Sequence, residues 1–261
     1  MSNLSPTRHS RDDALTDRQF EKLLEGARKL PDPQAFEARF VIHMAGRLGM
    51  RGGEIAHLSS DWVDMDQRMI VIPEHDPCSK GIDGGVCGYC KERAEDHVLS
   101  INLTEEEAKE EVREEFKDVD FPEAKIEELA QSKMDEQNIT LEQALEERWE
   151  PKTSNGDRSI PYDFDTRTQI VVEEFVDRYA IFPKARVAIN RRVGEAAEAA
   201  DLDARVYPHA LRATAANKLA LMDVSAYSLM SIMGWADIQT ARAYIQSNDQ
   251  NAAKEVRAKY R

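Results

Sequence analysis

Tyrosine, arginine, histidine and lysine side chains along this chain could together break a phosphodiester bond without a metal ion. Such a reaction needs a nucleophile that attacks phosphorus, fixed cations that hold the charge on the non-bridging oxygens, and an acid that protonates the departing 5′ oxygen. The candidates for these tasks are Arg51, Lys152, His209, Arg212 and Tyr244.

Two of the candidates, His209 and Arg212, stand in the segment Tyr207-Pro208-His209-Ala210-Leu211-Arg212-Ala213-Thr214. Their spacing of three residues puts both side chains on one face of a helix, which we expect at residues 208–221. Arg51 occurs in Gly49-Met50-Arg51-Gly52-Gly53-Glu54-Ile55. We expect a short helix to begin there, with Arg51 at its start.

Lys152 is the candidate acid because of its sequence context. It lies on an expected β-turn before a strand, in Pro151-Lys152-Thr153-Ser154-Asn155-Gly156-Asp157-Arg158-Ser159-Ile160-Pro161. Lys80 and Lys91 lie in the same region but lack this context. Trp235 comes nine residues before Tyr244, and its indole N–H can donate a hydrogen bond.

Each candidate alone has a simpler explanation. An isolated arginine such as Arg51 is usually a surface charge or a helix cap, and an isolated His209 is usually a hydrogen-bonded helix residue. Tyr244 is one of seven tyrosines and could serve packing, and Lys152 could be solvated. Their joint order along the chain favours the chemical interpretation.

This ordered series resembles the tyrosine recombinase, or phage integrase, family over residues 15–261, apart from an insertion. The resemblance is closest to integrases of halophilic archaea and of their viruses or plasmids. It implies that Tyr244 forms a 3′-phosphotyrosyl bond, that Arg51 and Arg212 clamp the scissile phosphate, and that Lys152 is the general acid. It further implies that His209 assists proton transfer and that Trp235, where many relatives have histidine, helps to position the phosphate. Glu54 is expected to be structural.

The same resemblance implies a mainly helical fold with a small three-stranded antiparallel sheet. It implies integration or excision of a viral or plasmid element, with double-stranded DNA as partner and a homo-tetramer on DNA. No cofactor is expected for catalysis. The alternatives are a type IB topoisomerase, and a DNA-binding regulator that has lost catalysis.

Residue patterns predict the elements that position these side chains. Thr16 and Gln19 form a capping box at the start of a helix, and a second helix follows Pro33 and stops at Gly49. Strands are expected at 62–65, 69–72 and 158–161. Further helices are expected at 166–179, 190–200, 208–221, 227–233 and 238–245.

The expected organisation is a flexible arm at 1–14 and a catalytic domain at 15–261 that carries an insertion at 75–149. The insertion holds a Cys-rich hairpin tip at 75–97 and an acidic helical segment at 104–149. This segment has 17 acidic and 6 basic residues, whereas residues 151–261 have 14 and 16, within a total charge of −14. The acid therefore need not oppose DNA binding elsewhere. It could serve solubility or a salty cytoplasm, and the segment could be a protein-binding surface or a solvated arm.

The chain's three cysteines lie within the hairpin tip, in the pattern His75-x2-Cys78-x8-Cys87-x2-Cys90. Four nitrogen or sulfur ligands suit a structural zinc, and His97 could replace His75. The alternative is three reduced thiols in a loop. No apolar run could span a membrane, no signal peptide is evident, and the protein is expected in the cytoplasm.

Overall fold

The structure, a computed structural model, describes residues 10–146, 149–153, 155–203 and 205–246. Contacts divide the chain into two units. Unit 1 comprises the described residues up to Glu74 and from Pro151 onward, and unit 2 comprises those of His75–Glu150. Within the described parts, no helix is long and apolar enough to cross a membrane.

Unit 1 contains the three-stranded antiparallel sheet that the sequence predicts. Its strands are β1 (Val63–Asp64), β2 (Met69–Ile72) and β3 (Arg158–Pro161), in the order β1-β2-β3. Ile70 pairs with Ile160, and both are fully buried. β1 is shorter than expected because Trp62 ends a 3₁₀ turn, η2 (Ser60–Trp62). The sheet thus buries one face while β3 carries the chain onward from the Lys152 turn.

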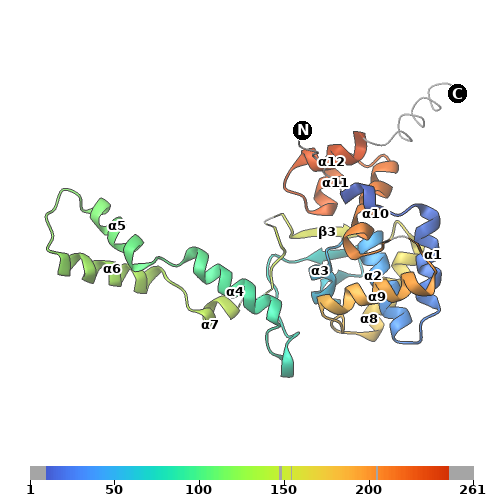
Figure 1. The fold of residues 1–261 in the computed structure, drawn as a ribbon, viewed down its shortest axis with the longest axis horizontal. Coiled ribbons are helices and arrows are strands. Elements are labelled where there is room, and N and C mark those ends of the chain that lie inside the picture. The colour runs from blue at the N-terminus through green and yellow to red at the C-terminus, as the bar shows by residue number, and fades with distance from the viewer. Residues whose placement is uncertain (1–9, 147–148, 154, 204, 247–261) are drawn as a thin grey trace, which may run out of the picture. The chain divides into compact units, whose positions relative to one another are not determined.

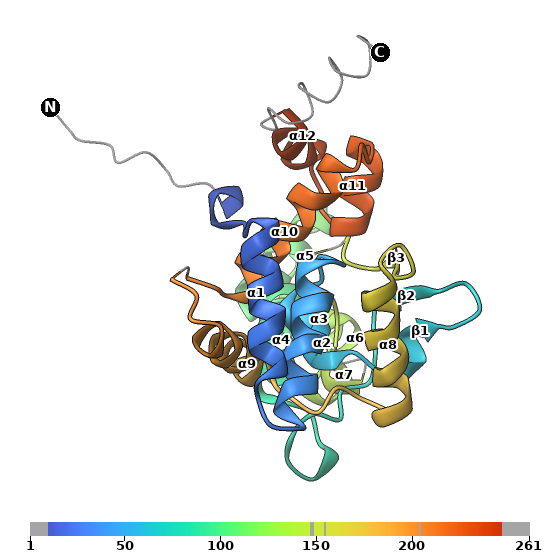
Figure 2. The same cartoon turned by 90° about the vertical axis from the view of Figure 1, so that its right-hand side faces the viewer.

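The helix α2 (Gln34–Gly46) is the centre of unit 1. Ten of its 13 residues are buried, which is why its sequence is apolar on nearly all sides. It contacts the four longest of the other helices in the unit (Figure 2). These four are α1 (Asp17–Arg28), α8 (Thr166–Arg178), α9 (Arg186–Ala199) and α10 (Pro208–Leu221).

Three shorter helices complete unit 1: α3 (Gly52–His57), α11 (Ala226–Met233) and α12 (Ile238–Gln246). The predicted helices are confirmed, and so is the capping box of Thr16 and Gln19. α9 begins four residues earlier than predicted, at Arg186.

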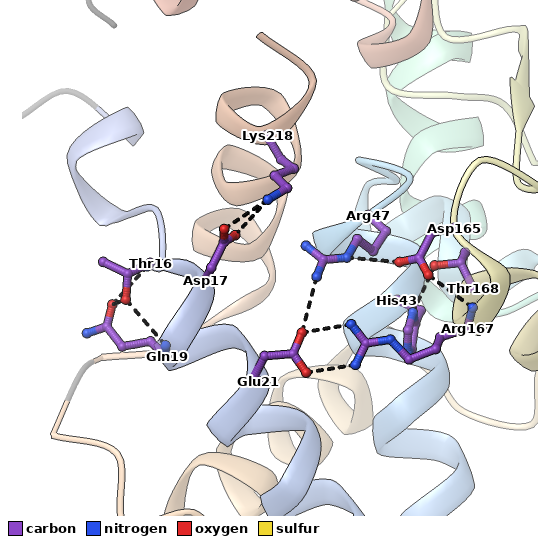
Figure 3. A network of polar contacts seen from close by, with 10 residues as sticks. All are labelled: Thr16, Asp17, Gln19, Glu21, His43, Arg47, Asp165, Arg167, Thr168 and Lys218. Atoms are coloured by element: carbon purple, nitrogen blue, oxygen red, sulfur yellow. Dashed lines mark hydrogen bonds and ion pairs between the residues drawn. The ribbon is translucent and has the colours of Figure 1, made fainter. Parts of the chain in front are cut away.

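A network of charged side chains ties α1, α2 and α8 together (Figure 3). Arg167 donates two hydrogen bonds to Glu21, at 2.7 and 2.8 Å. Arg47, which caps the C-terminus of α2, donates to Asp165 at 3.1 Å and lies 3.6 Å from Glu21. Its guanidinium also stacks on the Phe20 ring. These contacts fix the end of α2, four residues before Arg51.

Within residues 1–14, Ser10–Asp13 form a 3₁₀ turn, η1, that packs on α10. The hydroxyl of Tyr207 donates to Asp13. The backbone N–H of Leu15 donates to Thr214 at 2.8 Å in a buried contact. Residues 1–9 of the expected arm lie outside the described residues.

Unit 2 is helical, and its acidic part forms a hairpin of two helices (Figure 1). The hairpin consists of α5 (Glu105–Glu115) and α6 (Glu123–Gln137), with Pro122 at the N-cap of α6. A small apolar core joins the two helices, centred on Ala108, Val112, Ile126 and Ala130.

Two asparagines close the base of this hairpin. The side-chain amide of Asn102 pairs with the backbone of Ile139, and that of Asn138 pairs with the backbone of Leu103, with all four distances between 2.8 and 3.0 Å. The remaining elements of unit 2 are η3 (Ile82–Gly84), α4 (Gly88–Ile101) and α7 (Leu141–Glu146). The sequence did not predict α4. α7 lies within the acidic segment that was expected to be helical, and residues 147–148 lie outside the described residues.

Candidate active site

Arg51 stands at the N-cap of α3, where its guanidinium is held from three sides. Its Nη1 donates to Oε1 of Glu54 at 2.8 Å, and its backbone N–H donates to Oε2 of the same carboxylate at 2.7 Å. Its Nη2 donates to the carbonyl of Gly234 at 2.6 Å and to the hydroxyl of Thr153 at 3.3 Å. The Arg51 side chain keeps 18% exposure, so it still faces solvent.

Arg212 is more deeply buried, on α10, and backbone carbonyls anchor its side chain. Its guanidinium donates to the carbonyls of Gly49 and Met233. Burial, and then the positive charges of Arg51 and Arg158, lower the pKa of Arg212 to about 9, with Glu54 opposing them. The side chain therefore remains a cation at neutral pH.

Arg51 and Arg212 are brought together at the C-terminal end of α11. The carbonyls of Met233 and Gly234 are consecutive, and each accepts from one of the two guanidiniums. Gly234 adopts the left-handed conformation, with φ of 59°, that ends the helix. A side chain there would lie 2.8 Å from the carbonyl of Asn155. Glycine at this position lets the turn approach closely, and both guanidiniums can therefore act on one anion.

His209 and Lys152 lie at the same site. His209 occupies the first turn of α10, one turn from Arg212, and is exposed. Partial burial, and then the charge of Arg212, lower the pKa of His209; Asp13 opposes this and Lys152 adds to it. Lys152 is exposed, and its neighbour Thr153 accepts from Arg51. Lys152 is thus one residue from a contact of Arg51, and His209 is one helical turn from Arg212.

Tyr244 lies on α12 and packs on Trp235. The two rings are stacked, with centroids 5.2 Å apart and planes at 22°. Tyr244 is 4% exposed, inside a cluster with Leu229 and Met233. Tyr244 shares this cluster with Met233, and the carbonyls of Met233 and Gly234 anchor the two arginines.

Arg158 is a member of this site that the sequence interpretation did not single out. It fills the first position of β3, on the buried face of the strand. Its Nη1 and Nη2 each donate to one oxygen of Glu54 at 2.9 Å. Burial alone would raise the pKa of the Glu54 carboxyl, but Arg158, Arg212 and Arg51 together lower it. The available signal was an arginine at an inward-facing strand position, since such a charge needs a buried partner.

The three cysteines of unit 2 are also brought together. The sulfur atoms of Cys78, Cys87 and Cys90 lie within 4.8 Å of one another. Cys87 caps the N-terminus of α4, and the N–H groups of Cys87 and Cys90 each donate to a neighbouring sulfur at 3.5 Å. A hydrogen bond with Cys78, and then burial, raise the pKa of the Cys90 thiol.

His75, the expected fourth metal ligand, is not among the described side chains gathered within that distance. It lines a separate cavity of about 490 Å³ in unit 2, together with His97, Arg93 and Glu150. The cysteines and the two histidines therefore occupy different places within unit 2.

Comparison with solved structures identifies the fold. XerA recombinase aligns with a TM-score of 0.53 at 14% identity, over 95% of this chain and 65% of that one. The Tn1549 transposon integrase in complex with transposon right end DNA aligns with a TM-score of 0.57 at 16% sequence identity. That alignment covers 98% of this chain and 67% of the integrase chain. The same integrase in complex with circular intermediate DNA aligns with a TM-score of 0.56 at 16% sequence identity. That alignment covers 97% of this chain and 69% of the integrase chain. The chain spans about two thirds of the length of these structures.

The helical unit 1 with its three-stranded sheet is therefore the catalytic-domain fold of a tyrosine recombinase. The phage integrase family model matches residues 13–251. The chain belongs to the phage integrase family. A comparison with curated protein sequences gives no match.

Proposed function

We propose that this protein is a site-specific DNA recombinase that cuts and rejoins DNA through a covalent bond to Tyr244. The observation that carries the proposal is the convergence of Arg51 and Arg212 on the carbonyls of residues 233 and 234. Two fixed cations side by side suit the non-bridging oxygens of one phosphate. The helix with Tyr244 follows directly after this turn.

In the cleavage step, the phenolic oxygen of Tyr244 attacks phosphorus and the bond from phosphorus to the 5′ oxygen breaks. The phenolic proton leaves with the help of His209, whose lowered pKa keeps its imidazole neutral and able to accept it. The departing 5′ oxygen takes a proton from the ammonium of Lys152 and leaves as a hydroxyl. Trp235 holds the tyrosine ring and faces the phosphate with its indole N–H.

Strand exchange follows when a 5′ hydroxyl from a second DNA attacks the 3′-phosphotyrosyl bond and releases the tyrosine. The phosphotyrosyl ester retains the energy of the original phosphodiester, so no nucleotide, metal or other cofactor takes part. We place the enzyme in the cytoplasm, acting on double-stranded DNA as a homo-tetramer that holds two DNA sites.

The biological role that we propose is integration or excision of a viral or plasmid element. A Tn1549 transposon integrase bound to circular intermediate DNA is among the similar structures, and this supports a mobile-element substrate. The charge of −14 and the acidic α5–α6 hairpin support an origin in a halophilic archaeon or its virus. The phage integrase match favours recombination over the topoisomerase and regulator alternatives.

We also propose that Cys78, Cys87 and Cys90 hold a structural zinc ion. Three thiolates are preferred zinc ligands, and their sulfur atoms already lie within 4.8 Å. A bound zinc would stabilise unit 2 and take no part in catalysis. Protein purified without chelators should contain about one zinc per chain, and Cys87→Ser should lose it. Replacing each of the six histidines in turn would identify the fourth ligand. A metal content near zero would leave three reduced thiols.

The test of the recombinase proposal uses a pool of nicked DNA duplexes with randomised sequence. The nick lets a short strand diffuse away after cleavage, so the covalent complex accumulates. DNA that stays bound to the protein in denaturing detergent is recovered and sequenced. We expect one family of related sequences with the wild-type protein and none with Tyr244→Phe, which keeps the ring but lacks the nucleophile. Strand exchange between two recovered duplexes then separates a recombinase from a topoisomerase.

A further inference from the structure

Arg158 is buried at the start of β3, and nearly all of its hydrogen-bonding capacity is used inside the protein. Its side chain is 4% exposed. Its Nε donates to the carbonyl of Ile232 at 2.7 Å, and its Nη1 to that of Gly156 at 2.6 Å. With the two bonds to Glu54, four of the five N–H donors of the guanidinium are engaged. Arg158 is therefore poorly placed to bind phosphate itself.

The carboxylate of Glu54 joins Arg158 to Arg51. Its Oε1 accepts from Nη1 of both arginines, and its Oε2 accepts from Nη2 of Arg158 and from the backbone N–H of Arg51. Four donors fill this carboxylate, which is 2% exposed. Without Arg158, half of these donors would be lost in a site that water hardly reaches. The carboxylate would then turn, and Arg51 would turn with it.

Arg158 also supports the turn that anchors Arg212. Its bond to the carbonyl of Ile232 holds the residue immediately before Met233 and Gly234. A side chain on Gly234 would lie 3.0 Å from Nη1 of Arg158, so the turn rests against this guanidinium. Arg158 thus touches both supports of the arginine pair: the carboxylate of Glu54 and the end of α11.

The charges of the cluster agree with this arrangement. Arg51, Arg158 and Arg212 surround one carboxylate, so the cluster has a net charge of two positive units. A phosphodiester has one negative charge, and the five-coordinate phosphorus formed during attack has two. The cluster therefore matches the transition state better than the ground state, as catalysis requires.

We propose that Arg158 is a positioning residue, which fixes Glu54 and the 232–234 turn and so sets the geometry of Arg51 and Arg212 around the scissile phosphate. This inference rests on the phosphate-binding roles proposed for those two arginines. Arg158→Lys is the variant of choice because lysine keeps the positive charge but lacks the forked donor geometry. Arg192→Lys is a matched control, since Arg192 donates to Glu37 at 2.6 Å with side chains 6% and 1% exposed, and the pair lies on α9 and α2.

The experiment measures single-turnover cleavage and DNA affinity separately, on a nicked duplex recovered from the randomised pool. We expect Arg158→Lys to cleave about a hundredfold more slowly than the wild type while DNA affinity changes less than about threefold. Arg192→Lys should leave both values near wild type. A second substrate carries a neutral methyl group in place of one non-bridging oxygen at the scissile phosphate. With less charge to hold, the defect of Arg158→Lys should shrink to below about tenfold.

Cleavage by Arg158→Lys at the wild-type rate would overturn the proposal. A reduction of the cleavage rate that is equal on both substrates would also overturn it. If neither Arg158→Lys nor Arg158→Gln folds while Arg192→Lys does, the pair serves the fold itself and the positioning role is rejected. Thermal unfolding monitored by circular dichroism separates these cases. Failure of the wild-type protein to form any covalent complex would instead reject the proposed function, so the two failures are distinguishable.

Discussion

The ring of Tyr244 lies flat against the indole of Trp235, with ring centroids 5.2 Å apart. This contact joins α12 to the end of α11, where the carbonyls of Met233 and Gly234 anchor the two arginines. The candidate nucleophile and the candidate phosphate-binding groups therefore share one small packing unit. We therefore expect replacement of the Trp235 ring to destabilise the packing of α12.

Replacing Trp235 tests this packing. Trp235→Ala removes a half-buried ring and its stacking contact with Tyr244. The free energy of unfolding should fall by about 2 kcal/mol. Trp235→Phe keeps an aromatic ring on Tyr244 and should cost less than about 1 kcal/mol. Urea unfolding followed by circular dichroism measures both values. Equal stabilities for the two variants would show that stacking contributes nothing to this region.

The acid role of Lys152 is tested by changing the leaving group. Lys152→Ala should slow cleavage of ordinary DNA by about a hundredfold or more, because the 5′ oxygen leaves poorly as an anion. A substrate with sulfur at this 5′ position should restore most of the rate, since a thiolate departs without a proton. Lys91→Ala, a lysine of unit 2, serves as the control and should cleave both substrates normally. No restoration by sulfur would assign Lys152 to phosphate binding instead.

The buried His43 on α2 predicts a loss of stability in acid. Burial lowers the pKa of His43 to about 4, with Asp165 opposing the shift, and its Nδ1 lies 2.9 Å from the hydroxyl of Thr168. Below about pH 6.5 the unfolded chain takes up a proton at this histidine, and the folded protein does so only near pH 4. Stability therefore falls as the pH drops between these values.

Wild-type protein should accordingly lose about 2 kcal/mol more than His43→Gln between pH 7 and pH 5. Glutamine keeps a polar group beside Thr168 but does not titrate. Urea unfolding at the two pH values gives the difference. A parallel decline in both proteins would place the acid sensitivity between pH 7 and pH 5 at groups other than His43.

Local patterns in the sequence predicted much of this fold. The capping box of Thr16 and Gln19 marked the start of α1, and the strand expected at 158–161 is β3, which pairs with β2. The helix α4 was missed because three glycines between residues 84 and 88 and the cysteines indicated turns, although the helix begins at Gly88 itself.

The sequence suggested the parts of the candidate site but not the contacts that support them. Arg51, Arg212 and Tyr244 stand in recognisable local contexts, whereas the pair of Glu54 and Arg158 is separated by 104 residues. Nothing local in the sequence links these two side chains, because only the fold brings α3 beside β3. The sequence also grouped His75 with the three cysteines, from which the structure separates it. The spacing of candidate ligands along the chain does not determine the path of the loop that joins them.

The most direct test of the central claim is to locate the covalent bond between protein and DNA. Wild-type protein is trapped on a nicked duplex recovered from the randomised pool, digested with trypsin and nuclease, and analysed by mass spectrometry. The account predicts a nucleotide-modified peptide in which Tyr244 has the phosphate, and no modified peptide from Tyr244→Phe. A phosphate found on any other residue, or an unchanged yield of covalent complex with Tyr244→Phe, would contradict it.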